Sequence, residues 1–127
     1  MPAAISVRPG SRLAVVQLTG AVSGQEIAAA ADERSAHPDW EPGFRVIWDA
    51  TGVSELDVST DSFDVLLAQE RRLRARGEDG ELVFVVRDEV WASLVTLFSH
   101  KLRGEARPMT VVPTLDEAYA HLGVQAD

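Results

Sequence analysis

Two patterns of apolar residues alternate along the chain: short continuous runs, and longer stretches with apolar positions at steps of three and four. The continuous runs predict strands, and runs that are apolar on both faces are typical of central parallel strands. Strands are therefore expected at residues 5–8, 13–19, 44–48, 81–86 and 108–112. The turn Pro9-Gly10-Ser11 joins the first two as an antiparallel hairpin at one side of the sheet, and Gly20 is expected to end the second.

Helices are expected after the second and each later strand, because capping residues precede the stretches with helical spacing. The expected N-caps are Ser23 with Glu26 in a capping box, then Ser59, Thr60 or Asp61, then Asp88, and Thr114 with Glu117 in a second capping box. The expected stops are His37-Pro38, Gly77, Gly104 and Gly123. The resulting order, β-β-α-β-α-β-α-β-α, predicts a single α/β domain over residues 1–127, with a mixed, mostly parallel sheet and an antiparallel N-terminal hairpin.

Composition and charge narrow the classes of partner. The chain has 127 residues, a hydrophobic fraction of 46% and a formal net charge of −8, which disfavours wide contact with nucleic acid or anionic membranes. No apolar stretch approaches the roughly 20 residues of a membrane span, and the first residues lack the pattern of a signal peptide. The absence of cysteine fits a reducing compartment. We therefore expect a cytoplasmic protein.

Residue types that support catalysis or metal binding are not grouped along the chain. His37, His100 and His121 fall on different elements, and no pair of them has the helical spacing of a metal site. Ser99 and His100 are adjacent, but neighbours on a helix do not face each other. No glycine-rich phosphate loop follows a strand. We expect no catalytic residues, no metal and no cofactor.

Four arginines, Arg71, Arg72, Arg74 and Arg76, fall near the expected end of the second helix. There they complement the helix dipole, and Glu70 has the spacing to pair with Arg74. Two interpretations stay open: a solvated helix face, which we favour, and a docking patch for an acidic partner or a phosphate.

The three tryptophans raise a second open question. Trp48 on a central strand and Trp91 on an amphipathic helix are expected in the core, whereas Trp40 precedes a strand in a loop and is a candidate for a ligand or partner surface. The alternative to simple packing is an apolar pocket for a lipid-like or other apolar molecule, with aromatic walls and Asp49 at its mouth.

The segment from Asp49 to Thr60 is the best candidate for a functional surface. A buried strand is expected to end at Asp49, a loop follows, and hydroxyl side chains then open a helix. In open α/β sheets, ligands are handled at the carboxyl ends of strands and at helix N-termini. We take Asp49 and Asp57 as candidates for a ligand or partner surface. Ser59 and Thr60 are candidates for phosphorylation, against helix capping as the simpler role.

The chain resembles the SpoIIAA-like family, a branch without assigned activity within the STAS superfamily of anti-sigma-factor antagonist-like proteins. The segments that carry this resemblance are Leu18-Thr19-Gly20, residues 42–49, residues 82–86, Thr110-Val111-Val112 and Asp116-Glu117-Ala118-Tyr119. The resemblance implies the fold of that superfamily over nearly the whole chain.

The resemblance also singles out one serine. Antagonists of the superfamily carry an Asp-Ser-Ser-Gly-like motif eight residues after a strand-end aspartate, and a partner kinase phosphorylates its second serine. Asp49 and Asp57 keep that spacing, and Ser59 takes the phosphoserine position. Val58 and Thr60 stand in place of the first serine and the glycine.

Together these observations predict a non-enzymatic regulatory or binding module that acts through protein–protein contact, with a phospho-switch at Asp57 and Ser59 as its sharper form. A carrier or sensor of a lipid-like or other apolar small molecule is the alternative. A homodimer is one form that protein contact can take, because a hairpin at the side of the sheet leaves an edge that a second copy can cover.

Overall fold

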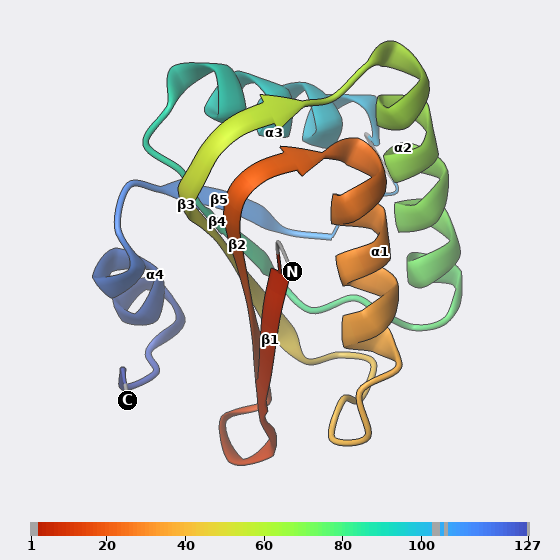
Figure 1. Cartoon of the computed structure of the whole chain (residues 1–127). Helices are drawn as coiled ribbons and strands as arrows, with labels where there is room; N and C mark the ends of the chain where they lie inside the picture. The colour runs from red at the N-terminus through yellow and green to blue at the C-terminus, as the bar shows by residue number, and fades with distance from the viewer. Residues whose placement is uncertain (1–2, 103–104, 106, 127) are drawn as a thin grey trace.

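The computed structural model describes residues 3–102, 105 and 107–126, which form one sheet with helices on both faces (Figure 1). In chain order the elements are β1 (Ala3–Arg8), the 3-10 turn η1 (Pro9–Ser11), β2 (Leu13–Ser23), α1 (Gly24–Ser35), β3 (Arg45–Asp57), α2 (Thr60–Ala75), β4 (Leu82–Val85), α3 (Glu89–Lys101), β5 (Met109–Val112) and α4 (Leu115–Leu122). The order of strands and α-helices is the one that the apolar patterns predict.

The strands lie side by side in the order β1-β2-β3-β4-β5. β1 is antiparallel to β2, and each later strand is parallel to its neighbour. α1 and α2 cover one face of the sheet, and α4 covers the other (Figure 1). The predicted class, a mixed and mostly parallel sheet with an antiparallel N-terminal hairpin, is confirmed.

The sheet divides the core in two because successive side chains of a strand point to opposite faces. On β3, Val46 and Trp48 join the apolar cluster under α1, to which Trp91 of α3 also packs, whereas Ile47 joins the cluster under α4. Trp48 is buried and Trp91 is half-buried, so both pack in or against the core as expected.

β2 and β3 are longer than the sequence predicts. β2 continues through Gly20 to Ser23, and β3 continues through Asp49 to Asp57, so the predicted strand ends at Gly20 and Asp49 are wrong. The two strands stay paired over their whole length, with register shifts between Gln17 and Thr19 and between Gly20 and Ala21. Gly20 has a φ of +75°, so the glycine accommodates an irregular strand instead of ending it.

The structure confirms most of the predicted N-caps and capping boxes. Ser23 and Glu26 form a reciprocal capping box, Ser59 caps α2, and Asp88 caps α3. Thr114 accepts a hydrogen bond from the backbone of Glu117, but the structure gives no return bond from Glu117, so the second capping box is only half formed.

The helix ends lie close to the predicted stops wherever the structure describes them. Gly123 closes α4 in the left-handed conformation, and Gly77 adopts a positive φ just after α2. α1 ends at Ser35, shortly before His37-Pro38. Gly104, the expected stop of the third helix, lies outside the described residues.

Candidate functional site

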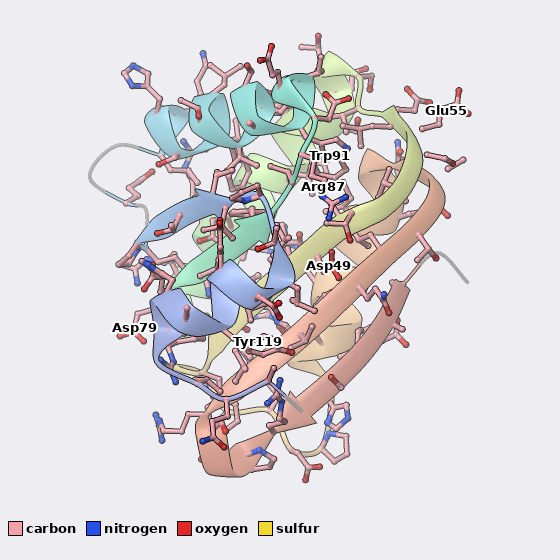
Figure 2. The ribbon with its side chains drawn as sticks, turned by 90° about the vertical axis from the view of Figure 1, so that its left-hand side faces the viewer. Asp49, Glu55, Asp79, Arg87, Trp91 and Tyr119 are labelled. Carbon is pink, nitrogen blue, oxygen red and sulfur yellow. The ribbon has the colours of Figure 1, made fainter. Side chains whose placement is uncertain are left out.

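Asp49 lies within β3 and not at a strand end. Its side chain is 4% exposed, and Oδ1 accepts hydrogen bonds from the backbone N–H of Thr51 at 3.0 Å and from its hydroxyl at 2.7 Å. Figure 2 shows the sheet from the side that α4 covers. Asp49 lies on this side, and so does Tyr119 of α4. The carboxylate is therefore satisfied locally, because a polar group buried in a strand needs hydrogen-bond partners.

The extension of β3 also separates residues that the sequence places in one loop. Asp49 and Asp57 are eight residues apart on one strand, which corresponds to about 26 Å in a fully extended strand. The candidate surface is thus divided into a buried carboxylate in the middle of the sheet and an exposed group at the far end of β3.

The exposed group consists of Asp57, Ser59 and Thr60, which we call the α2-start surface. All three are exposed, at the point where β3 ends and α2 begins. The Ser59 hydroxyl accepts from the backbone N–H of Ser62 at 3.1 Å and lies 3.0 Å from its hydroxyl, and the Ser59 N–H donates to Ser62 Oγ at 2.9 Å. Ser59 is both an N-cap and a surface hydroxyl.

The starts of α1 and α2 meet beside this surface. Ser23, the N-cap of α1, lies opposite Asp57 in the register of β2 and β3. Gly24 packs so closely on α2 that a β-carbon placed there would stand 2.6 Å from the β-carbon of Ser62. The contact needs glycine at residue 24, and it fixes the first turn of α2 against that of α1.

Trp40 is buried and does not form part of a surface. It is 8% exposed, its ring meets Phe44 edge-to-face at 5.7 Å, and the Arg34 guanidinium lies 4.6 Å from its ring centre. Trp40 is therefore not part of a ligand or partner surface as predicted, because the turn before β3 folds the indole onto the core cluster under α1.

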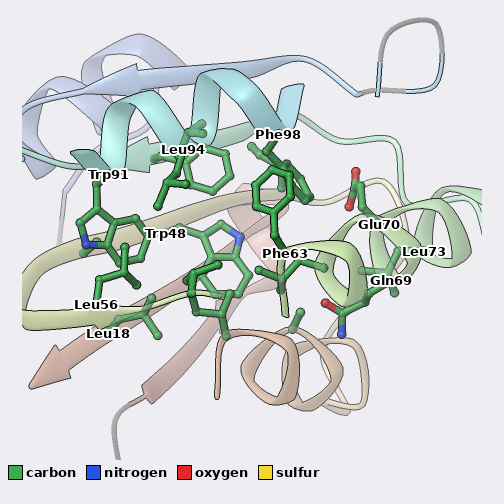
Figure 3. A pocket seen from close by; sticks show the side chains of 18 of the residues that line it. Leu18, Trp48, Leu56, Phe63, Gln69, Glu70, Leu73, Trp91, Leu94 and Phe98 are labelled. Carbon is green, nitrogen blue, oxygen red and sulfur yellow. The ribbon is translucent and has the colours of Figure 1, made fainter. Parts of the chain in front are cut away.

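An apolar cavity of about 110 Å³ lies between the sheet, α1, α2 and α3. Aromatic side chains from the strands and both helices converge on it (Figure 3). Those aromatic residues are Trp48, Phe63, Phe84, Trp91 and Phe98. The predicted aromatic walls are present, but neither Trp40 nor Asp49 is among the lining residues, so Asp49 is not at the mouth.

A second, more polar cleft of about 490 Å³ adjoins the cavity where β3 passes the start of α3. Both spaces are lined by Leu56 near the end of β3, by Val58 just after it and by Trp91 of α3. Since Val58 directly precedes Ser59, the cavity wall and the α2-start surface belong to one continuous segment of chain.

Sequence reasoning missed a cluster of four buried charges near the other end of the cavity. Arg107 binds both carboxylate oxygens of Glu70, at 2.8 and 2.9 Å, and lies 3.6 Å from Glu78. Arg34 binds Glu78 at 2.5 Å. Burial lowers the pKa of Arg34, and the carboxylate of Glu78 opposes this shift.

This cluster also corrects the predicted pairing of Glu70 with Arg74. Glu70 faces the interior, and the side chain of Arg74 donates instead to the backbone carbonyl of Glu105, while Arg71 pairs with the Glu105 carboxylate at 2.9 Å. The sequence did contain a sign of this burial. Gln69 and Glu70 fall at helical spacing between Leu66 and Leu73, which places these two polar residues on the buried face of the helix.

Among the histidines, His121 lies 2.6 Å from Glu81. In the described residues no group of three or more His, Asp or Glu side chains is arranged to hold a metal ion. Within the same residues, no helix combines the length and apolar character needed to cross a membrane.

The fold of this chain combines an antiparallel first pair of strands, a parallel remainder and helices on both faces of the sheet. The solved structure of the unphosphorylated anti-sigma factor antagonist SpoIIAA is similar to this chain, with a TM-score of 0.59 and 16% sequence identity over 95% of this chain and 97% of that one. No protein-family model and no curated protein matches the sequence. The likeness confirms the predicted fold.

Proposed function

We propose that the chain is a non-enzymatic regulatory module that acts through protein contact at the α2-start surface. The observation that carries the proposal is an exposed hydroxyl, Ser59, at the first turn of α2 on a fold shared with an anti-sigma factor antagonist. Ser59 combines exposure with a rigid setting, since the contact between Gly24 and Ser62 holds the helix start in place.

The sharper form of the proposal is a phospho-switch at Ser59. A phosphate on this N-cap hydroxyl would lie against the free N–H groups of the first helical turn, which favour negative charge. Asp57 and Asp61 flank the site and would repel that phosphate. Phosphorylation would therefore add negative charge to an already acidic surface. The added charge would change the affinity of a protein that contacts this surface.

Intact-mass analysis after incubation with ATP and an extract of cells that encode the chain tests the switch. We expect the mass of one phosphate to be added to the unaltered protein and to Thr60→Val, and none to Ser59→Ala. Addition of a phosphate to Ser59→Ala, or no addition to any protein, contradicts the switch.

Protein contact is tested separately, because the chain has no cysteine and a single one can be introduced. Thr60→Cys carries a photo-activated crosslinker at the α2-start surface, and Asp116→Cys, exposed on α4, is the matched control. We expect one discrete protein adduct from the cysteine at residue 60 only. Equal adducts at both positions, or none, count against this surface.

A second candidate function is the binding of a small apolar molecule, and the cavity is the observation that favours it. Its wall is almost wholly apolar and rich in aromatic side chains, as is typical of ligand pockets. Native mass spectrometry of freshly purified protein is expected to show a bound small molecule. A mass equal to that of the chain alone weakens this candidate.

Protein contact also includes self-association through β1. This strand is an edge of the sheet, and its segment Ala3–Val7 carries no charge and no proline, the features that usually protect an edge. At the opposite edge, β5 has four residues and lies between Pro108 and Pro113. β1 is therefore the edge that we propose a second copy covers.

A further inference from the structure

The wall of the apolar cavity is interrupted at one end by three polar side chains. Arg34, Gln69 and Glu70 line it there, and the remaining lining residues are apolar. Figure 3 shows Gln69 and Glu70 on α2 at one side of the cavity, away from Trp91. A ligand in this cavity would thus meet hydrogen-bonding groups at one end only.

The amide of Gln69 has one orientation. Its Nε2 donates to the backbone carbonyl of Ala28 at 2.7 Å and to Asp32 Oδ1 at 3.1 Å. Both partners are acceptors, so the nitrogen and not the oxygen must face α1. Oε1 accepts no hydrogen bond from the part of the chain that the structure describes, although the residue is 4% exposed. This acceptor belongs to a residue that lines the cavity, so a donor in the cavity could bond to it.

The charges at this end cancel. Glu70 is held by two hydrogen bonds from Arg107, and Arg34 is paired with Glu78, so two positive and two negative groups face one another. A carboxylate or phosphate on a ligand would approach the Glu70 carboxylate without any surplus positive charge to offset the repulsion and the loss of hydration. Arg34 Nε, buried and without a partner among the described residues, adds a donor but no net charge.

We propose that the cavity binds a small uncharged molecule with an apolar body and one hydroxyl, which donates to Gln69 Oε1. This inference rests on the second candidate function, the binding of an apolar molecule. The volume of about 110 Å³ is smaller than the roughly 150 Å³ of a cavity that binds benzene, so the body can be no larger than one ring. The five aromatic side chains of the wall suit such a ring.

Three probes of similar size, phenol, toluene and benzoate, test the inference by calorimetry or by NMR shifts of the unaltered protein. Toluene is the most hydrophobic, so a wholly apolar cavity would bind it most tightly. We expect phenol to bind at least as tightly as toluene and benzoate to bind most weakly. Toluene binding more tightly than phenol, or benzoate matching phenol, overturns the inference and leaves the cavity a binding site. No binding of any probe overturns both the inference and the second candidate function.

A substitution assigns the selectivity to the amide of Gln69. Gln69→Met keeps the length of the side chain and removes Oε1 together with Nε2, which faces α1, and Gln25→Met, exposed on α1, is the matched control. We expect phenol binding to weaken by about fivefold in Gln69→Met, the effect of one hydrogen bond, while toluene binding is retained. An unchanged ratio of phenol to toluene binding in Gln69→Met also overturns the inference. The three-probe series on the unaltered protein decides the question if this variant does not fold.

Discussion

At the scale of single residues, two glutamates that pair with arginine differ in whether their charges are buried. Glu70 and Glu105 both pair with arginine, but Glu70 lies in the interior with Arg107, whereas Glu105 lies on the surface with Arg71. Replacing a buried partner leaves an uncompensated charge out of water, while a surface pair contributes little because solvent screens it. The two glutamates therefore form a matched pair for mutation.

We expect Glu70→Gln to lower the free energy of unfolding by about 3 kcal/mol, because the buried Arg107 loses the carboxylate that accepts its two hydrogen bonds and keeps only the more distant Glu78. Glu105→Gln is expected to lower it by less than about 1 kcal/mol. Urea unfolding followed by circular dichroism measures both. Equal losses in the two variants would contradict a structural role for the buried cluster.

The ionisation of Glu81 makes the stability of the fold depend on pH. Burial raises the pKa of this glutamate, but hydrogen bonds from His121 and Thr110 and the nearby positive charges outweigh burial, so the net shift lowers its pKa below the ordinary value of 4.5. A carboxyl with a lowered folded-state pKa stabilises the fold above its unfolded pKa, and this contribution is lost as pH falls through the folded-state value.

We therefore expect the stability difference between the unaltered protein and Glu81→Gln to be greatest near neutral pH and to shrink as pH falls through and below 4.5. Unfolding free energies measured across that range check this, with Glu117→Gln, exposed on α4, as a control for the loss of one carboxylate. A difference that stays constant with pH would show that Glu81 does not act through its charge.

Individual site residues were harder to place from the sequence than caps. Ser59 as an N-cap followed from residue type and spacing alone, because capping is a local interaction. The burial of Trp40 and the pairing of Glu70 with Arg107 depend on contacts between distant segments. No local pattern encodes such contacts, so these assignments required the structure.

At the scale of elements, the start of α2 carries both a structural and a proposed regulatory role. We expect Ser59→Ala to lower the free energy of unfolding by about 1 kcal/mol, because the N–H of Ser62 loses its acceptor. Ser59→Asp should retain most of the stability, since aspartate is an equally good N-cap and adds charge where a phosphate would. Ser54→Ala, exposed on β3, is the control and should change stability by less than about 0.5 kcal/mol.

Thermal or urea unfolding of the three variants measures these effects. A Ser59→Asp variant as unstable as Ser59→Ala would mean that added negative charge is not tolerated at the α2 start. That result would also weaken the proposed phospho-switch, since the flanking Asp57 and Asp61 would then outweigh the helix N–H groups.

Element lengths show where sequence patterns stop being informative. The start of β3 is apolar apart from Arg45 and was predicted, but its second half contains Gly52 and several exposed polar residues and was interpreted as a loop. That half is a strand because β2 runs beside it to Ser23 and pairs with it. Pairing between distant strands is a tertiary property, and it overrides local preference.

At the scale of the whole molecule, alternating strands and helices were sufficient to predict the layers. Right-handed crossovers leave few ways to arrange parallel strands, so the observed β-β-α-β-α-β-α-β-α order strongly limits the topology. The cavity was predicted only as an alternative to solid packing. The choice between the two depends on how well side chains from β3, α2 and α3 fill the space between them, which the periodicity does not encode.

Self-association is also a property of the whole molecule, and β1 allows a specific test. We expect sedimentation at micromolar concentration to show a dimer that strengthens as salt is added, because a net charge of −8 on each copy opposes association at low salt. Ala4→Lys places a charge on the free edge and should give a monomer.

The matched control for this edge is Gln17→Lys. Gln17 pairs with Ala4 across β1 and β2 and is exposed, but its strand is interior to the sheet. A lysine at residue 17 adds the same charge at the paired position of the neighbouring strand and does not block the edge, so the dimer should persist. Loss of the dimer in both variants would point to a contact through the sheet face instead, and a monomer at every salt concentration would remove the β1 dimer altogether.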